Sequence, residues 1–172
     1  MFGGAVHLQN SVGVLTVQNS NISNNVAMQG GGFSVMSSKV SLNSSHISDN
    51  VASVQGGAVL SMDSELNCSA GTRFERNVAV TGAAVADASH GSSAVSIMNL
   101  KDSVIRSNGG TAKGVSTLSA AAVLQSCTVS TCSMVLEHML VSNNSVLGDT
   151  AGIQQDRGQG TIQILNSEIS SN

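Results

Sequence analysis

The chain of 172 residues is poor in aromatic side chains, proline and charge. It contains three phenylalanines but no tryptophan, tyrosine or proline, and 10% of its residues are charged, against about 25% in an average soluble domain. A net charge of −3 provides no positively charged surface for nucleic acid. The chain also has too few aromatic side chains for bases to stack on. The chain is 41% hydrophobic, which is too apolar for a typical disordered protein. We therefore expect a folded domain that does not bind nucleic acid.

The sequence also lacks long apolar runs. No run reaches the length of about 18 residues that indicates a membrane-spanning helix, and the first residues show no charged or apolar region of a signal peptide. The cysteines are Cys68, Cys127 and Cys132. An odd number, with the last two so close, fits neither a disulfide framework nor a zinc site. We expect all three to be small core residues.

An internal repeat is the strongest signal in the sequence. Its template is Φ-x-Φ-x4-Φ-x-x-N, where Φ is apolar, as in Leu15, Val17, Ile22 and Asn25. Successive copies place their asparagines 25, 27, 31, 36 and 28 residues apart, so loops of variable length interrupt a constant frame. The six asparagines are Asn25, Asn50, Asn77, Asn108, Asn144 and Asn172.

The spacing of the apolar residues predicts an all-β fold. Alternation with period two is typical of strands, and glycine and asparagine interrupt the runs every few residues. Strands this short can bury their apolar face only by stacking on the equivalent strand of the next repeat. We therefore predict a single-stranded parallel β-helix of about six coils, a β-solenoid. It would form one repeat domain over residues 1–172 and would be a fragment of a longer array, because neither end carries a recognisable cap.

The recurrent asparagine has a structural interpretation. A tight corner between two sheets favours a residue that tolerates left-handed backbone geometry, as asparagine does. Stacked in register, each amide could also donate to the same amide one coil away, so we predict an asparagine ladder. The Gly-Gly-Ala segments are interpreted similarly, since glycine allows corner dihedrals and close backbone approach.

Two tetrapeptides resemble a known family. Gly3-Gly4-Ala5-Val6 and Gly56-Gly57-Ala58-Val59 match GGA(I/L/V), and Phe74-Glu75-Arg76-Asn77 matches FxxN. This pair of motifs resembles the repeats of chlamydial polymorphic outer membrane proteins, and similar repeats are found in large surface proteins of protists. The resemblance implies a right-handed β-helix. It also implies an exported and often adhesive passenger at the cell surface, in the outer membrane or outside the cell.

Enzymatic chemistry has little support in the sequence. A polysaccharide lyase or hydrolase built on this fold would need clustered carboxylates. Asp63 and Glu65 are expected to share one strand face, with no third carboxylate beside them. Asp87 and His90 are a weak candidate for a catalytic pair and are otherwise expected on a polar loop at the side of the solenoid.

The remaining candidate sites are equally sparse. The four histidines do not share one repeat phase, so we predict no metal site and no cofactor. His46 precedes the apolar Ile47 and is expected to point outward. Four sequons occur, three of them at similar outward-facing positions of the repeat, and they could be glycosylated in a eukaryotic secretory protein. The sequons begin at Asn21, Asn43, Asn67 and Asn143.

Three functional hypotheses follow. The first is a non-enzymatic surface or extracellular solenoid, an adhesin-like stalk or binding scaffold. It would contact glycans or host or cell-surface proteins through long loops near residues 86–94, 109–122 and 154–160, and its ends would meet adjoining coils or another copy. The second is part of a polysaccharide-active β-helix whose catalytic coils lie outside this chain. The third is a truncated fragment with no function of its own.

Overall fold

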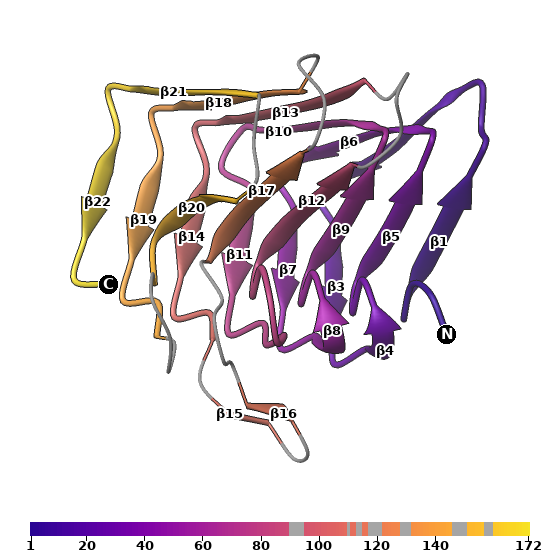
Figure 1. Ribbon diagram of the computed structural model, residues 1–172, viewed down its shortest axis with the longest axis horizontal. Coiled ribbons are helices and arrows are strands. Elements are labelled where there is room, and N and C mark those ends of the chain that lie inside the picture. Colours follow the sequence, from indigo (N-terminus) through magenta and orange to yellow (C-terminus); the bar gives the residue numbers. More distant parts are fainter. Residues whose placement is uncertain are drawn as a thin grey trace.

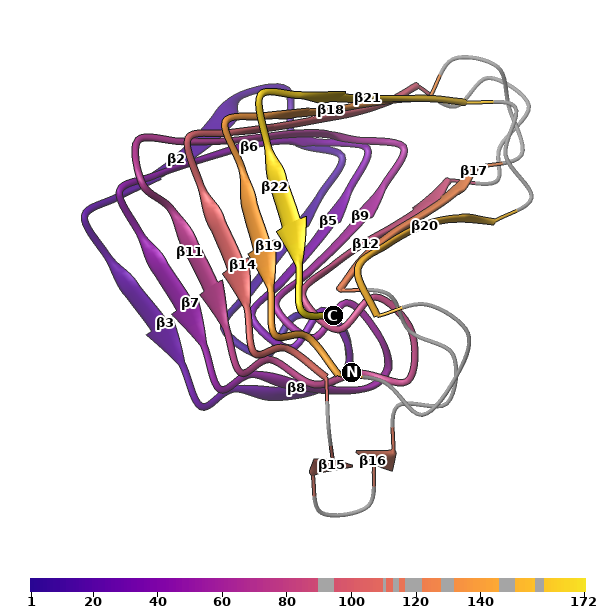
Figure 2. The ribbon, with the colours of Figure 1, turned by 90° about the vertical axis from the view of Figure 1, so that its left-hand side faces the viewer.

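The computed structural model is a parallel β-solenoid with three faces, each formed by one six-stranded sheet (Figures 1 and 2). The six strands of each sheet correspond to the six copies of the repeat, and the path from β1 to β20 makes about five turns. The structure describes residues 1–89, 95–109, 111–112, 115–116, 122–127, 132–145, 151–156 and 160–172.

Every coil contributes one strand to each sheet in the same order, and all neighbouring strands within the three sheets are parallel. Sheet 1 contains β1 (Val6–Gln9), β5 (Phe33–Met36), β9 (Val59–Met62), β12 (Val85–Ser89), β17 (Val123–Cys127) and β20 (Ile153–Asp156). Sheet 2 contains β2 (Val14–Gln18), β6 (Lys39–Asn43), β10 (Glu65–Ser69), β13 (Ser96–Lys101), β18 (Cys132–Glu137) and β21 (Thr161–Leu165). Sheet 3 contains β3 (Asn21–Ser23), β7 (His46–Ser48), β11 (Arg73–Glu75), β14 (Val104–Arg106), β19 (Leu140–Ser142) and β22 (Glu168–Ser170).

Two small pairings complete the described strands. β4 (Val26–Gln29) pairs with β8 (Val51–Gln55) in parallel between sheets 3 and 1. β15 (Thr111–Ala112) and β16 (Val115–Ser116) form an antiparallel pair that projects from the solenoid (Figure 2). The described residues include no helix that is long and apolar enough to cross a membrane.

The apolar positions of the repeat form the core. In sheet 2 the register aligns the Φ-x-Φ positions of all six copies, so Val40 and Leu42 lie beside Leu66 and Cys68 of the next coil. In sheet 3 the middle residue of each strand points inward, and Ile47, Phe74, Ile105 and Val141 are fully buried. Because each side chain stacks on its equivalent one coil away, at about 4.8 Å, a short motif repeated six times makes one continuous core.

The sequence interpretation assigned the left-handed backbone geometry to the ladder asparagine, but the structure places it one residue earlier. The left-handed residue is the one that precedes the asparagine, with φ between 53° and 59°, as at Asn24, Asp49 and Arg76. The chain bends at this exposed or half-exposed residue, and the asparagine that follows turns its amide inward toward the neighbouring coils. The need for a left-handed residue therefore explains Asn24 and Asn143, and the ladder asparagines have another cause.

Glycine is required at the corner that leads into sheet 1. Gly30 has φ of +64°, a conformation that side chains with a Cβ rarely adopt. A Cβ on Gly57 would lie 2.0 Å from the carbonyl oxygen of Ala83 in the next coil. The first glycine of the motif thus supplies the turn, and the second allows two coils to approach each other.

Candidate functional site

The asparagine ladder runs through all six coils. The Nδ2 of Asn25 donates to the Oδ1 of Asn50 at 2.9 Å, and the pattern continues at 2.8–3.1 Å to Asn172. The same oxygen also accepts the backbone N–H of the preceding ladder residue, as from Asn50 to Asn77 at 3.1 Å. Each buried amide also donates to a carbonyl of the previous coil, such as Asn77 to Ile47. These contacts satisfy buried polar groups, so the ladder has a structural role.

Hydroxyl side chains stack at the other two corners, a feature that the sequence interpretation missed. Between sheets 1 and 2, the backbone N–H of Ser11 donates to Ser38 Oγ, and that of Ser38 donates to Ser64 Oγ. Between sheets 2 and 3, Ser20 donates in the same way to Ser45. The signal was present in the sequence, since a hydroxyl residue stands two positions before the sheet 3 core residue in five of six copies. These residues are Ser20, Ser45, Thr72, Ser103 and Ser167.

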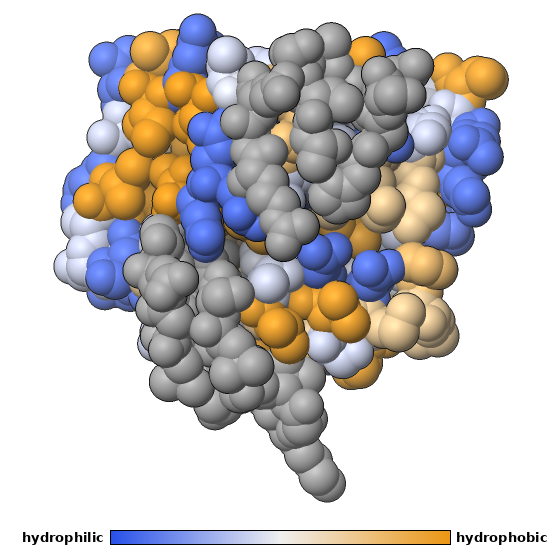
Figure 3. Space-filling view, in the orientation of Figure 1, coloured by the Kyte–Doolittle hydropathy of each residue, from blue (hydrophilic) through white to orange (hydrophobic). Residues whose placement is uncertain are grey.

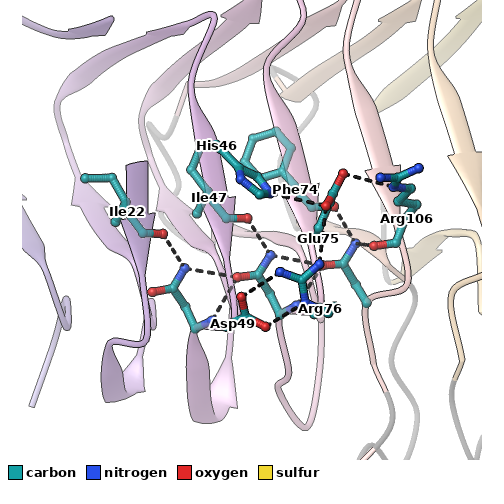
Figure 4. Close-up of polar contacts among 11 residues, drawn as sticks. Ile22, His46, Ile47, Asp49, Phe74, Glu75, Arg76 and Arg106 are labelled. Carbon is teal, nitrogen blue, oxygen red and sulfur yellow. Dashed lines mark hydrogen bonds and ion pairs between the residues drawn. The ribbon is translucent and has the colours of Figure 1, made fainter. Parts of the chain in front are cut away.

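A network of charged side chains covers the outer side of sheet 3 (Figure 4). Glu75 lies at its centre, with its side chain 5% exposed, and accepts from Arg106 Nε at 2.9 Å. His46 Nε2 lies 3.2 Å from the other carboxylate oxygen. Arg76 reaches Glu75 at 3.4 Å and holds Asp49 with two contacts of 2.7 and 2.8 Å. The network ties together three neighbouring coils, and His46 points outward as expected.

The network also lowers the pKa values of its two carboxylates, Glu75 and Asp49. Burial by itself raises the pKa of Glu75, but Arg106 and His46 outweigh this effect and hold it below the ordinary value. The hydrogen bond from Arg76 lowers the pKa of Asp49 against the smaller opposing effect of burial. Both groups are therefore ionised at neutral pH, and each is paired with an arginine, as in a structural ion pair.

A shallow groove of about 480 Å³ follows the corner between sheets 1 and 2. Glu65 lines it and pairs with Lys39 of the previous coil at 2.9 Å. Asp63 also lines it, but it lies in the corner with φ of 51°, so it does not share a strand face with Glu65 as predicted. The remaining lining residues are hydroxyl or apolar: Ser11, Val12, Ser37, Ser38, Ser64, Val95 and Ile97.

The weak catalytic candidate Asp87 does not face solvent. It was expected on a polar loop, but it lies in β12, and its residue is fully buried. Val85, two residues earlier, is in the core, so Asp87 points into the solenoid as well. His90 lies outside the described residues. A carboxylate that faces the interior cannot meet a polymeric substrate on the outer surface.

The cysteines also differ from the prediction. Cys127 and Cys132 form a disulfide that joins the end of β17 to the start of β18. Their closeness in sequence, which argued against a framework of disulfides, is what lets one bridge span the corner between sheets 1 and 2. Cys68 is a free, buried core residue as expected, and burial raises the pKa of its thiol.

The histidines and sequons do not assemble into a site. Among the described residues, no group of three or more His, Cys, Asp or Glu side chains is placed to hold a metal ion. His7 stacks on Phe2, and His138 pairs with Asp102 at 3.2 Å. Of the sequon asparagines, Asn21 and Asn143 are exposed, and Asn43 and Asn67 are partly exposed in sheet 2. Their glycosylation stays a prediction.

The long loops proposed to carry specificity lie partly outside the described residues. Residues 90–94, most of 110–121 and residues 157–159 fall there, as do 149 and 150 of the last, degenerate copy of the glycine motif. Within the predicted loops, residues 86–89 continue β12, and residues 154–156 belong to β20.

Comparison of the chain with protein-family models, curated proteins and solved structures found no match.

Proposed function

We propose that this chain is a repeat segment of a non-enzymatic solenoid, displayed at a cell surface or outside the cell, that acts as a stalk or binding scaffold. One observation carries the proposal: the polar side chains of neighbouring coils bond to one another. The asparagine ladder, the hydroxyl stacks and the ion pairs Lys39–Glu65 and Lys101–Glu137 all join adjacent coils. Such contacts stiffen a rod along its axis, as a stalk requires.

The disulfide supports an extracellular location. Cys127–Cys132 fits an oxidising compartment, where disulfides form and persist, better than the reducing cytosol. The resemblance to the polymorphic outer membrane proteins agrees with this location. In the FxxN motif of this chain, Phe74 fills the core and Asn77 continues the ladder. We propose membership of that repeat class on these grounds.

The ends of the solenoid suit adjoining coils or a second copy of the chain. β20, β21 and β22 form an open edge, and a hollow of about 680 Å³ there is lined by Ile153, Ile162, Ile164 and Ile169. Figure 3 shows apolar side chains gathered at this end of the molecule. Open parallel edges pair readily with further strands.

Glycans or host or cell-surface proteins are the proposed partners along the sides. The phenylalanines offer little to a sugar, because Phe33 and Phe74 are fully buried and Phe2 alone is exposed, beside His7. Contact would therefore depend on hydroxyl and amide groups, and repeated weak contacts along an array could add up to useful avidity.

Incubation with a panel of polysaccharides tests the non-enzymatic proposal. Titration calorimetry would measure binding, and chromatography would measure new reducing or unsaturated chain ends. We expect no cleavage of any polymer. Cleavage by the parent chain that disappears after heat unfolding would contradict the proposal, and its persistence in Asp87→Asn would show that the active site lies elsewhere on the fold.

A further inference from the structure

One row of inward side chains in the solenoid becomes polar in the third, fourth and fifth coils. In sheet 1 the inward row begins with Leu8 and Val35 and then continues as Ser61, Asp87 and Gln125. The parallel row two residues earlier, which includes Val59, Val85 and Val123, stays apolar throughout. Polar side chains thus replace apolar ones at one inward position of three successive strands.

The solenoid also widens beside these side chains. β12 and β17 pair as far as Ser89 and Cys127, and β13 and β18 already pair at Ser96 and Cys132. Figure 2 shows these longer strands running beyond the corner at which β9 meets the next sheet. We call Ser61, Asp63, Asp87 and Gln125 the interior polar site.

The interior polar site contains buried atoms that lack hydrogen-bond partners. Asp87 accepts from Ser89 Oγ at 2.7 Å on one carboxylate oxygen, whereas its Oδ2 has no partner. The side-chain oxygen and nitrogen of Gln125 are both unpartnered, as are Ser61 Oγ and Asp63 Oδ1. Ser61, Asp87 and Gln125 are fully buried. Buried polar groups are normally satisfied, so this group of unpartnered atoms indicates a missing ligand.

The charge of the interior polar site favours a cation. None of the ion pairs in the part of the chain that the structure describes involves Asp87 or Asp63. A buried carboxylate without a positive partner is costly unless a cation neutralises it.

We propose that the interior polar site binds a calcium ion. The available ligands are all oxygens: Asp87 Oδ2, Asp63 Oδ1, Gln125 Oε1 and Ser61 Oγ. Calcium accepts mixed carboxylate, amide and water oxygens in flexible geometry, whereas magnesium demands a near-ideal octahedron. The ion would enter along the groove between sheets 1 and 2, since Asp63 lines that groove as well.

Thermal melting of the chelator-stripped chain at pH 7.5 tests this proposal. Calcium at up to about 10 mM, a concentration that saturates weak extracellular sites, should raise the Tm in a saturable manner. Magnesium and potassium at matched ionic strength should raise it much less. Calorimetry should find one calcium ion per chain.

Two variants make the test specific. Asp87→Asn removes the buried charge, so without calcium its Tm should equal or exceed that of the parent chain, and its response to calcium should be lost. Asp102→Asn changes a half-exposed carboxylate on the surface and should keep the full response. The proposal is overturned if calcium leaves the Tm of the parent chain unchanged. It is also overturned if Asp87→Asn responds as the parent does, or if magnesium or potassium acts as strongly as calcium.

Discussion

Replacement of Asn77 by alanine measures what the ladder contributes to stability. Asn77 is fully buried in the middle of the ladder. Its Nδ2 donates to Ile47 O and Asn108 Oδ1, and its Oδ1 accepts from the backbone and side-chain nitrogens of Asn50. Alanine leaves two groups of Asn50 without a partner: its backbone N–H and one of its amide hydrogens. The backbone bond from Asn77 to Asn108 survives.

The magnitude follows from these two groups. A buried polar group that loses its partner costs about 1–3 kcal/mol, so Asn77→Ala should lower the free energy of unfolding by about 2–6 kcal/mol. For a domain of this size, about 1 kcal/mol shifts the Tm by about 2–4 °C. The Tm should therefore fall by at least about 4 °C in thermal melting followed by circular dichroism.

Asn172→Ala is the matched control. It deletes the same side chain at the exposed end of the ladder, where water can replace the lost acceptor of Asn144. Its cost should stay near or below about 1 kcal/mol. Equal destabilisation by the two substitutions would refute the reasoning, as would a loss below about 1 kcal/mol at Asn77, because burial would then not decide the cost.

Three further predictions concern the network on sheet 3, the cysteines and the corners. Glu75→Gln should lower the stability by about 1–2 kcal/mol at pH 7. Because the pKa of Glu75 is lowered in the folded state, this difference should shrink as the pH falls below the ordinary value of 4.5 and should vanish only below the lowered pKa in pH-dependent melting. Thiol titration should find no reactive thiol in the native chain, one after unfolding, and three after unfolding with reductant; three without reductant would exclude the disulfide. Asn143→Gly should be neutral or stabilising, whereas Asn143→Val should cost about 1–2 kcal/mol in urea unfolding, because φ is 53° there; equal effects would argue against a left-handed corner.

The sequence was sufficient for the fold because the repeat is redundant. One apolar pattern occurs six times, and in a solenoid each copy predicts the neighbours of the next. The alignment of Val40 with Leu66, and of Asn50 with Asn77, follows from that rule alone. The position of the left-handed residue did not follow, because Arg76 and Ser107 occupy it without the glycine or asparagine that normally marks such a turn.

The individual side-chain contacts were harder to predict than the arrangement of the strands. The network around Glu75 joins residues from three coils that differ in length, so no fixed separation in the sequence predicts it. Asp87 was placed outside because a polar residue near a loop is normally exposed. Only the strand register shows that it follows Val85 on the inward face. The disulfide was missed because its spacing fits no recurrent framework.

Surface labelling of intact source cells tests the central claim most directly. An antibody to this segment, combined with a membrane-impermeant biotin reagent and a cytosolic marker protein as control, would report location and native size together. The account predicts a labelled band in the surface or secreted fraction. A band that is protected from the reagent and fractionates with the cytosolic marker would contradict an extracellular scaffold.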